Sequence, residues 1–330
     1  MDICIIKLGA AGDVVRTLHI LPAIKEKYPN SKITWITKPE VSELLEGNPY
    51  INKIVTLNYQ DIEKNEYDIV YNFDIEEDAT NLAVKIKAKK KYGFYSENGY
   101  AASFNSGAEY YLNTIFDDQL KKKNKKTYQE MMFMAAELPY DKDKYFCGIY
   151  LNEKDRKYAE DFVKNNKIET EKLIGIHMGA ASRWPSKVWH PDRVKEFIKR
   201  AKNEGYNVLL FGGPNEVEAH RKLAEELKKE GIDIYQNKPS NTKKEFASLV
   251  NLCKVMICSD SLSLHVALSL KKETIGLFFC TSPDEVEGYK YLKKIISPML
   301  YDFFPERSDE YSEELVKSIS ADIVLKEIKI

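Results

Sequence analysis

An aspartate follows the first apolar run of the chain. Residues 3–8 read Ile-Cys-Ile-Ile-Lys-Leu, and a glycine-containing turn at residues 9–12 leads directly to Asp13. In open α/β sheets, ligands bind beyond the carboxyl ends of the strands, so this turn would present the Asp13 carboxylate to a ligand at a helix N-terminus. The same carboxylate could instead cap that helix, a role worth about 0.5–2 kcal/mol. The two roles are compatible, and the spacing alone favours the cap.

A hydroxyl and a lysine follow a later apolar run. Ser182 and Lys187 lie downstream of the apolar residues 173–177 and of Gly179. These two groups, placed after a strand and a glycine turn, suit a phosphate, which the positive end of the following helix also favours. The alternative is an exposed lysine beside two packed tryptophans, and the residues alone support both interpretations.

Paired glycines form a third candidate site. Gly212 and Gly213 follow the apolar residues 207–211 and precede Glu216. Glycines after a strand let a ligand approach the backbone, and Glu216 could accept hydrogen bonds from ribose hydroxyls. A tight strand-to-helix turn, in which Glu216 stabilises the helix dipole, is the alternative.

A polar cluster at residues 259–265 forms the fourth candidate. Asp260 and Ser261 stand between an apolar run and a helix, and His265 falls within the first turns of that helix. Hydroxyls and amides at a helix start can bind an anion. A helix cap with a half-buried histidine is the alternative. A serine hydrolase is not indicated, because neither serine lies in a G-x-S-x-G turn.

Two lysine-rich groups lie in the first half of the chain. The first covers residues 85–91 and the second covers residues 121–126. Such runs are usually solvated faces. Here they could also receive an anionic acceptor or lean on an anionic lipid surface.

Strands and helices alternate around these sites. In the first half we expect strands at 3–8, 32–37, 53–57 and 67–73, with helices after residue 13 and at 39–46. In the second half we expect strands at 173–177, 207–211, 232–235, 255–258 and 273–279. Helices are expected there at 192–203, 216–230, 243–252 and 262–270. This alternation predicts parallel sheets with right-handed crossovers.

Two such series in tandem predict an α/β protein made of two facing Rossmann-like domains with a cleft between them. We expect an N-terminal domain at 1–150 and a C-terminal domain at 151–312, with a charged helical stretch at 152–166 as the linker. The tail at 313–330 is expected to be helical and to pack back on the N-terminal domain. A length of 330 residues fits two domains.

Composition excludes several classes of protein. A net charge of −1 argues against a general nucleic-acid binder. The acidic start does not fit a signal peptide, and no apolar stretch approaches the ~20 residues of a membrane span. Five scattered cysteines fit buried thiols of a cytosolic protein, and their spacing does not indicate a metal site.

The loops together resemble glycosyltransferase family 9, the ADP-heptose:lipopolysaccharide heptosyltransferases. Residues 7–15, with Thr17-Leu18 and Pro22-Ala23, are similar to the opening of that family. Further elements follow in the family's order: Tyr67-Asp68-Ile69-Val70, Lys91-Tyr92-Gly93-Phe94, Gly179 to Trp189, Phe211-Gly212-Gly213 with Glu216, and Asp260-Ser261 with His265. The resemblance therefore spans nearly the whole chain.

The resemblance implies a GT-B fold, with the acceptor domain first and the donor domain second. It implies that Asp13 is the general base of an inverting transfer, which takes the proton from the acceptor hydroxyl. The acceptor site is expected to include Gly12, Lys89 and Lys91. The donor-binding residues that it implies are Ser182, Lys187, Gly212, Glu216, Asp260, Ser261 and His265.

The expected donor is a nucleotide diphosphate sugar, most simply ADP-heptose. The expected acceptor is an anionic glycolipid or glycan, such as a lipopolysaccharide or lipooligosaccharide core. A diphosphate is already a stabilised leaving group, so positioning and positive charge can act without a metal or other cofactor. The expected location is cytoplasmic, at the inner face of the inner membrane when the acceptor is a lipid.

Two alternatives remain at this stage. Leu262 stands where the family has glycine and could crowd the donor sugar, which leaves open a catalytically silent GT-B protein that only binds a nucleotide or glycan. An NADP-dependent oxidoreductase would use the Gly9 turn, with Lys38 on the 2′-phosphate. The dinucleotide fingerprint is broken, because it would need glycine at Ala11 and Val14.

Overall fold

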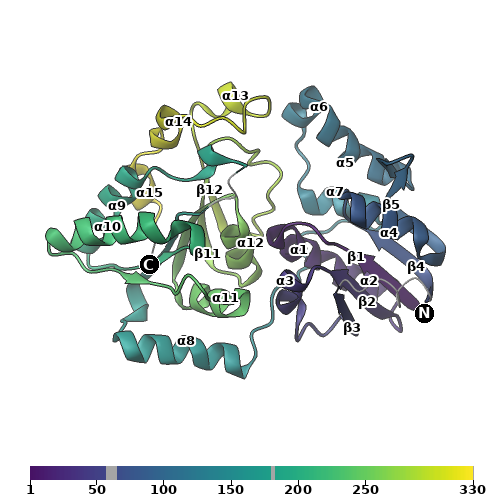
Figure 1. Cartoon of the computed structure of the whole chain (residues 1–330), viewed down its shortest axis with the longest axis horizontal. Helices are drawn as coiled ribbons and strands as arrows, with labels where there is room; N and C mark the ends of the chain where they lie inside the picture. The colour runs from purple at the N-terminus through teal and green to yellow at the C-terminus, as the bar shows by residue number, and fades with distance from the viewer. Residues whose placement is uncertain (57–64, 180–182, 330) are drawn as a thin grey trace. The chain divides into compact units, whose positions relative to one another are not determined.

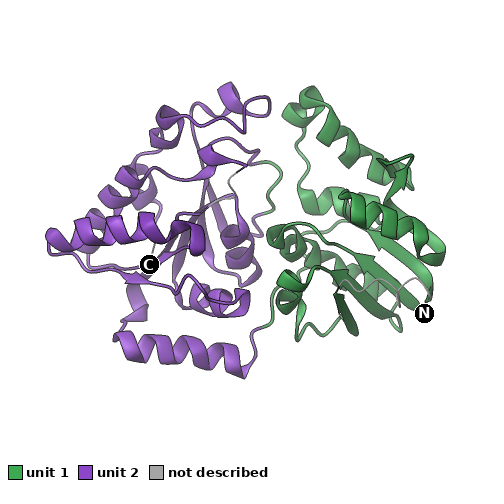
Figure 2. Cartoon of the chain, in the orientation of Figure 1, with its two compact units in different colours: residues 1–150, 284–287 green, residues 151–283, 288–330 purple. Residues whose placement is uncertain are grey.

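The chain forms two compact units, each built on one six-stranded sheet. The computed structural model describes residues 1–56, 65–179 and 183–329. Unit 1 comprises residues 1–150 and 284–287, and unit 2 comprises residues 151–283 and 288–330 (Figure 2). Both sheets are mainly parallel, as the alternation of strands and helices predicts.

The sheet of unit 1 has the strand order β3-β2-β1-β4-β5-β6 (Figure 1). Its strands are β1 (Asp2–Ile6), β2 (Lys32–Thr37), β3 (Lys53–Thr56), β4 (Glu66–Asn72), β5 (Lys87–Glu97) and β6 (Tyr100–Ser103). Its helices are α1 (Ala11–Thr17), α2 (Leu21–Lys27), α3 (Pro39–Ser42), α4 (Glu77–Lys85), α5 (Ser106–Phe116), α6 (Asp118–Lys123) and α7 (Tyr128–Ala135). The chain changes direction across the sheet between β1 and β4, which makes this the switch point where ligands bind in such folds.

The sheet of unit 2 has the strand order β12-β11-β10-β7-β8-β9. Its strands are β7 (Leu173–His177), β8 (Asn207–Phe211), β9 (Tyr235–Gln236), β10 (Val255–Ser259), β11 (Glu273–Phe278) and β12 (Leu292–Ile296). Its helices are α8 (Glu153–Asn166), α9 (Pro191–Asn203), α10 (Val217–Lys229), α11 (Lys243–Leu252), α12 (Leu262–Ser269), α13 (Leu300–Phe303), α14 (Glu313–Lys317) and α15 (Ala321–Lys326). Its switch point lies between β7 and β10.

Most of the expected elements are confirmed to within a residue or two, and the tail is helical as expected, in two short helices of which α15 packs on α9 within unit 2. The expected strand 232–235 is wrong, because the strand found there, β9, has only the two residues Tyr235–Gln236. One antiparallel pair, β5 with β6, extends the otherwise parallel first sheet. Packing of the tail on the first half of the chain stays a prediction.

In both units, apolar side chains recur with the period of the strand or helix that carries them, and they pack into the core. Strand β10 is buried along its whole length, as expected of a central parallel strand covered on both faces. Helix α9 buries Val194, Phe197, Ile198 and Ala201, whose spacing of three and four places them on one face. The resulting cores fix the strand ends, and the strand ends position the loops that carry the candidate sites.

Gly93 lies at a close approach between neighbouring strands of unit 1. Its φ is +89°, and a Cβ at this position would lie 1.9 Å from the carbonyl oxygen of Asn72. We predict that Gly93→Ala lowers the free energy of unfolding by roughly 4 kcal/mol or more, because backbone must move as well as φ. Gly99 is the matched control, since it has φ +85° with no atom within 4 Å of such a Cβ. Urea denaturation should show a loss of only about 1–2 kcal/mol for Gly99→Ala, and equal losses for the two variants would contradict this account.

Candidate functional site

Asp13 lies in the first turn of α1, close to the switch point of unit 1. The N-cap of α1 is Ala10, which makes no side-chain cap hydrogen bond, so the expected role of Asp13 as the helix cap is wrong. Instead, Asp13 Oδ1 lies 2.9 Å from an Arg16 guanidinium nitrogen, and Asp13 Oδ2 lies 3.9 Å from Lys7 Nζ. One third of the aspartate side chain is exposed. A carboxylate held in this way stays available to a ligand.

Asp74 is a second carboxylate at the same place, and the sequence interpretation missed it. It follows β4, on the other side of the switch point, and only 2% of the residue is exposed. Its Oδ2 accepts hydrogen bonds from the backbone N–H groups of Leu8, at 2.8 Å, and Gly9, and lies 3.6 Å from Lys7 Nζ. The rule that led to the other loops, inspection of the residues after each strand, also leads to Asp74 when applied to β4.

Tyr128 covers the two cations of this group. Its ring centroid lies 3.6 Å from the Arg16 guanidinium carbon and 5.9 Å from Lys7 Nζ. Its hydroxyl is 3.0 Å from Thr17 Oγ1. Burial raises the pKa of the Tyr128 phenol, which keeps the phenol neutral. We call Lys7, Asp13, Arg16, Asp74 and Tyr128 the Asp13 site.

The charges of the Asp13 site support one another. Burial alone would lower the pKa of Lys7, but its interactions with Tyr128, Asp74 and Asp13 outweigh burial and raise that pKa. Lys7 is therefore charged although only 4% of it is exposed. Two cations beside Asp13 favour its ionised form, which is the form that can accept a proton.

Lys187 occupies the switch point of unit 2. Its Nζ donates to the backbone carbonyl of Asp260, at 3.0 Å, and lies 3.3 Å from the Asp260 carboxylate. His265 Nε2 lies 3.7 Å from the other carboxylate oxygen. The expected alternative of an exposed lysine is wrong, because the Lys187 side chain is 15% exposed. The loops after β7 and β10 thus meet in one polar group.

The hydroxyl of Ser261 makes its hydrogen bonds within its own loop. Ser261 is the N-cap of α12 but makes no side-chain cap hydrogen bond. Its Oγ donates instead to the Ser259 carbonyl, at 3.2 Å, and pairs with Ser263 Oγ. Leu262 is half-buried at the start of α12. Ser182, also expected here, lies outside the described residues; Lys187, Asp260, Ser261 and His265 form the Lys187 site.

The backbone on both sides of Lys187 is hydrogen-bonded to the C-terminal part of unit 2. Ser186 Oγ donates to the carbonyl of Glu310 at 2.8 Å, and the Trp189 indole N–H donates to that of Ile319 at 3.0 Å. These anchors fix the backbone next to Lys187. The position of the lysine therefore depends on packing as well as on its ion pair.

Glu216 closes the turn after β8. One of its carboxylate oxygens accepts a hydrogen bond of 2.7 Å from the backbone N–H of Gly213. The structure therefore contains the tight strand-to-helix turn that was the alternative to a ribose-binding role for Glu216. A Cβ on Gly179 would lie 2.9 Å from the Glu216 carboxyl carbon, and one on Gly212 would lie 2.8 Å from Glu216 Cβ. The loops after β7 and β8 are therefore in close contact, and a side chain at either glycine would displace Glu216 or a neighbouring histidine ring.

Two histidines lie next to these glycines, His220 buried and His177 half-buried. Burial lowers the pKa of His177 and that of His220 to about 4. The His220 Nε2 has no hydrogen-bond partner in the part of the chain that the structure describes. Both rings are therefore neutral at pH 7, and both would have to bind a proton in the apolar interior at low pH.

We predict a loss of stability in acid from these histidines. The unfolded chain binds their protons near pH 6.5 and the folded chain only near pH 4, so the free energy of unfolding should fall between these values. Each histidine should contribute at most about 3 kcal/mol. Urea denaturation of the wild type and of His220→Gln from pH 7 to pH 4 isolates this contribution from that of the carboxylates. Parallel stability curves for the two proteins would contradict it.

The lysines expected at the acceptor site lie elsewhere on unit 1. Lys89 pairs with Asp68 at 2.7 Å, near the start of β4 and away from its carboxyl end. Lys91 donates to the carbonyls of Ala83 and Val84 at the end of α4. Neither is brought to Asp13 by the contacts seen here, whereas Gly12 is buried in the first turn of α1 beside it. A role for these lysines stays a prediction.

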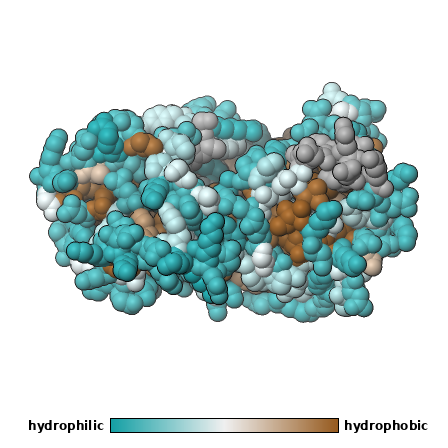
Figure 3. Space-filling model, turned by 60° about the horizontal axis from the view of Figure 1, so that its bottom comes forward, coloured by the Kyte–Doolittle hydropathy of each residue, from teal (hydrophilic) through white to brown (hydrophobic). Residues whose placement is uncertain are grey.

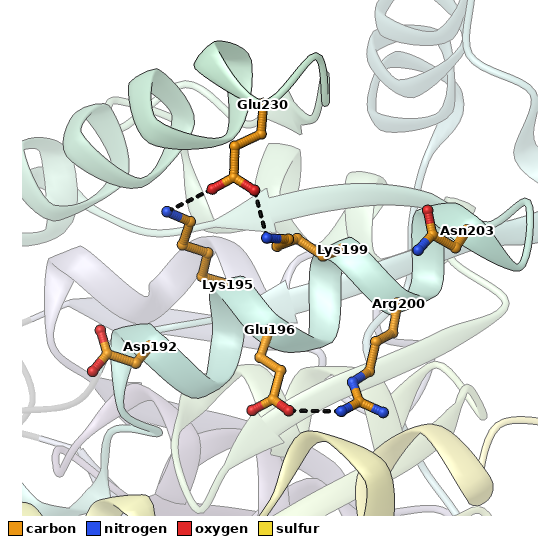
Figure 4. Close-up of a pocket in the computed structure, with 7 residues that line it drawn as sticks. All are labelled: Asp192, Lys195, Glu196, Lys199, Arg200, Asn203 and Glu230. Carbon is orange, nitrogen blue, oxygen red and sulfur yellow. Dashed lines mark hydrogen bonds and ion pairs between the residues drawn. The ribbon is translucent and has the colours of Figure 1, made fainter.

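A surface groove between α9 and α10 is a weaker candidate. Its lysines 195 and 199 both pair with Glu230, and Glu196 pairs with Arg200 at 2.9 Å (Figure 4). These charges are satisfied by one another, and the groove lies along two helices rather than at the ends of strands. Figure 3 shows that hydrophilic residues cover most of one face of the molecule.

Other features expected from the sequence can be compared with the structure. All five cysteines are unpaired and buried, as expected. Within residues 1–56, 65–179 and 183–329, no cluster of three His, Cys, Asp or Glu side chains is arranged to hold a metal ion. The helices in these same ranges are all too short or too polar to cross a bilayer. Lys38, considered for a 2′-phosphate, pairs with Glu76 at 2.7 Å.

Comparisons with known proteins converge on one family. Residues 57–316 match the sequence profile of glycosyltransferase family 9 (heptosyltransferase). The chain is 23% identical over 311 residues to the lipopolysaccharide core heptosyltransferase OpsX of Haemophilus influenzae, covering 90% of this chain and 84% of that protein. It is 32% identical over 123 residues to lipopolysaccharide heptosyltransferase 2 of Salmonella typhimurium, covering 37% and 34% of the two chains.

Solved structures show the same fold. The glycosyltransferase family 9 structure from Veillonella parvula superimposes with a TM-score of 0.78 at 20% identity, covering 98% of this chain and 95% of that one. The Escherichia coli ADP-heptose lipopolysaccharide heptosyltransferase II superimposes with a TM-score of 0.68 at 20% identity, covering 96% and 98%. Both are likenesses of fold over nearly the whole chain.

Proposed function

This chain belongs to glycosyltransferase family 9 and has the GT-B fold, and from that premise we propose that it transfers a heptose from ADP-heptose to a surface glycan, with inversion at the anomeric carbon. The acceptor class that we propose is the core of a lipopolysaccharide or lipooligosaccharide. This proposal is supported by the relatives, of which OpsX is named a lipopolysaccharide core heptosyltransferase and the Salmonella protein a lipopolysaccharide heptosyltransferase. The broken dinucleotide fingerprint and this membership leave the oxidoreductase alternative without support.

One observation carries the donor assignment. Lys187 holds a charged ammonium group at the switch point of unit 2, between the loops after β7 and β10. An ammonium at the carboxyl ends of parallel strands, with the start of α12 beside it, suits a diphosphate. Lys187, Asp260, Ser261 and His265 would then bind the diphosphate and sugar, with Ser182 contributing a hydroxyl and Glu216 and Gly212 receiving the ribose.

Asp13 is the proposed general base. Its carboxylate lies beside Arg16 and Lys7, two cations that favour its ionised form, and its side chain is one third exposed. In the transfer it would take the proton of the acceptor hydroxyl while that oxygen forms a bond to the anomeric carbon. The bond from the anomeric carbon to the ADP oxygen breaks in the same step, and the electron pair leaves with the diphosphate, whose charge Lys187 would stabilise.

The acceptor side is proposed to be anionic. Gly12 would allow close approach beside Asp13, and Lys89 and Lys91 would add positive charge to unit 1. The same lysines could hold the enzyme at the cytoplasmic face of a membrane that carries a lipid-linked acceptor. We propose that the transfer needs no metal or other cofactor.

A donor panel tests the proposed function. Purified protein is incubated with a lipooligosaccharide core and with ADP-heptose, ADP-glucose, UDP-glucose or GDP-mannose, with and without EDTA, and the released nucleotide is measured. We expect release of ADP from ADP-heptose above that from the other donors, unchanged by EDTA. If no donor supports transfer but calorimetry still shows ADP binding, the result would favour the alternative of a catalytically silent binding protein. The half-buried Leu262 is the residue that suggests this alternative.

A further inference from the structure

The two carboxylates of unit 1 share one buried lysine. Lys7 Nζ lies 3.6 Å from Asp74 and 3.9 Å from Asp13, so its charge is divided between a buried acid and a partly exposed one. Asp74 is 2% exposed and makes its contacts within the fold, whereas Asp13 is open to a ligand. Asp13 thus lies within a row of alternating charges that runs from Asp74 through Lys7 and Asp13 to Arg16.

Asp74 also holds the backbone that leads to Asp13. Its Oδ2 accepts the N–H groups of Leu8 and Gly9, and its Oδ1 accepts that of Glu76 at 3.0 Å. A Cβ on Gly9 would lie 3.0 Å from that Oδ2, so the Gly9 turn rests directly on this carboxylate. A neutral amide at position 74 could not accept the same set of bonds, because its nitrogen is not an acceptor.

A general base needs some proton affinity, and the cations around Asp13 reduce it. Arg16 and Lys7 both favour the ionised carboxylate, which makes Asp13 a weaker base. The phenols packed nearby do not offset them, because burial raises the pKa of Tyr111 and of Tyr128 and keeps both neutral. Asp74 is the negative group that offsets Lys7.

We propose that Asp74 is a positioning residue for the transfer reaction. Asp74 fixes the backbone of the Gly9 turn and offsets the charge of Lys7, so that Asp13 keeps enough proton affinity to act as a base. The inference rests on the proposed function for its catalytic meaning. The charge balance itself is a property of unit 1, and it can be measured without any sugar donor.

The first test is the titration of Asp13. The carboxyl carbon shift of Asp13 is followed by NMR in protein labelled with ¹³C-aspartate, with Asp13→Asn used to assign the signal. In Asp74→Asn, Lys7 is no longer offset, so we expect the pKa of Asp13 to fall by about one unit. An unchanged titration of Asp13 would overturn the proposal.

Asp68→Asn is the matched control. Asp68 lies near the other end of β4, accepts the backbone N–H of Asp2 at 2.8 Å and pairs with Lys89 at 2.7 Å. Like Asp74, Asp68 is a carboxylate that accepts a backbone N–H and pairs with a lysine. Unlike Asp74, it has no contact with the Asp13 site among those described here. We expect Asp13 to titrate in Asp68→Asn as in the wild type, and an equal shift in both variants would mean a nonspecific effect of lost charge.

A second variant covers the case in which Asp74→Asn does not fold. Lys7→Gln removes the cation itself, so the pKa of Asp13 should rise rather than fall. If the protein transfers sugar from a donor, the acid limb of its pH profile of kcat should move with the pKa of Asp13. The limb should move to lower pH in Asp74→Asn and to higher pH in Lys7→Gln, while the KM for the donor stays within about twofold. A drop in kcat without movement of the limb would make Asp74 a structural residue only and overturn the proposal.

The titration also separates this inference from the proposed function. If the wild type transfers no sugar but Asp13 titrates as predicted, the proposed function fails and the charge balance stands. If transfer occurs and the titration does not move, the proposed function stands and the role of Asp74 is wrong.

Discussion

Asp13→Ala is expected to lower the rate of heptose transfer by about 10²–10⁴-fold, the range typical for loss of a positioned general base. The KM for ADP-heptose and the affinity for ADP should stay close to those of the wild type, because Asp13 belongs to unit 1 and the proposed donor groups belong to unit 2. Initial rates over a range of donor concentrations, together with calorimetry of ADP binding, measure both quantities. A loss confined to kcat is the signature of an interaction made in the transition state.

Asp78→Ala is the control for this variant. Asp78 is an exposed acid in the first turn of α4, which follows β4 as α1 follows β1. The two variants lose a similar interaction with a helix dipole, worth about 0.3–1 kcal/mol. If Asp78→Ala loses as much activity as Asp13→Ala, or if Asp13→Ala keeps the wild-type rate, Asp13 is not the base.

Lys187→Met should have the second largest effect. Methionine keeps the length of the side chain and removes the ammonium, which would face the charge that develops on the leaving diphosphate. Removal of one such group typically costs about 10²–10³-fold in rate. We expect a loss of that size in kcat/KM for ADP-heptose and weaker binding of ADP, measured by the same two methods.

Lys195→Met controls for the loss of a lysine from unit 2. Lys195 pairs with Glu230 in the groove of Figure 4 and also with Glu226, so its removal also breaks ion pairs. Its activity and ADP affinity should match those of the wild type. An ADP affinity unchanged in Lys187→Met would contradict the proposed role of Lys187 in binding the donor.

Much of the fold follows from local pattern. Strands β7 and β8 and helix α11 have the bounds that the apolar runs and their flanking residues predict. Strand β5 was missed because four lysines in its first half hide the alternation that would reveal it. Strand β9 is shorter than its apolar run and lies at the edge of its sheet, beside β8.

The candidate sites divide in the same way. Residues that follow a strand, such as Asp13, Lys187 and Asp260, could be found because parallel strands bring their carboxyl ends to one edge. The contact between Asp74 and Gly9 joins residues 65 positions apart, and only the order of the strands makes them neighbours. The lysines of β5 could not be placed from charge alone, since charge does not say which end of a sheet a strand presents.

Inversion at the anomeric carbon is the most direct consequence of a base that activates the acceptor for a single displacement. The measurement is the NMR spectrum of the glycan formed from ADP-heptose, in which the one-bond carbon–hydrogen coupling at the new linkage reports its anomeric configuration. We expect the configuration opposite to that of the donor. A product that retains the donor's configuration would require a different mechanism, and it would contradict the role proposed for Asp13.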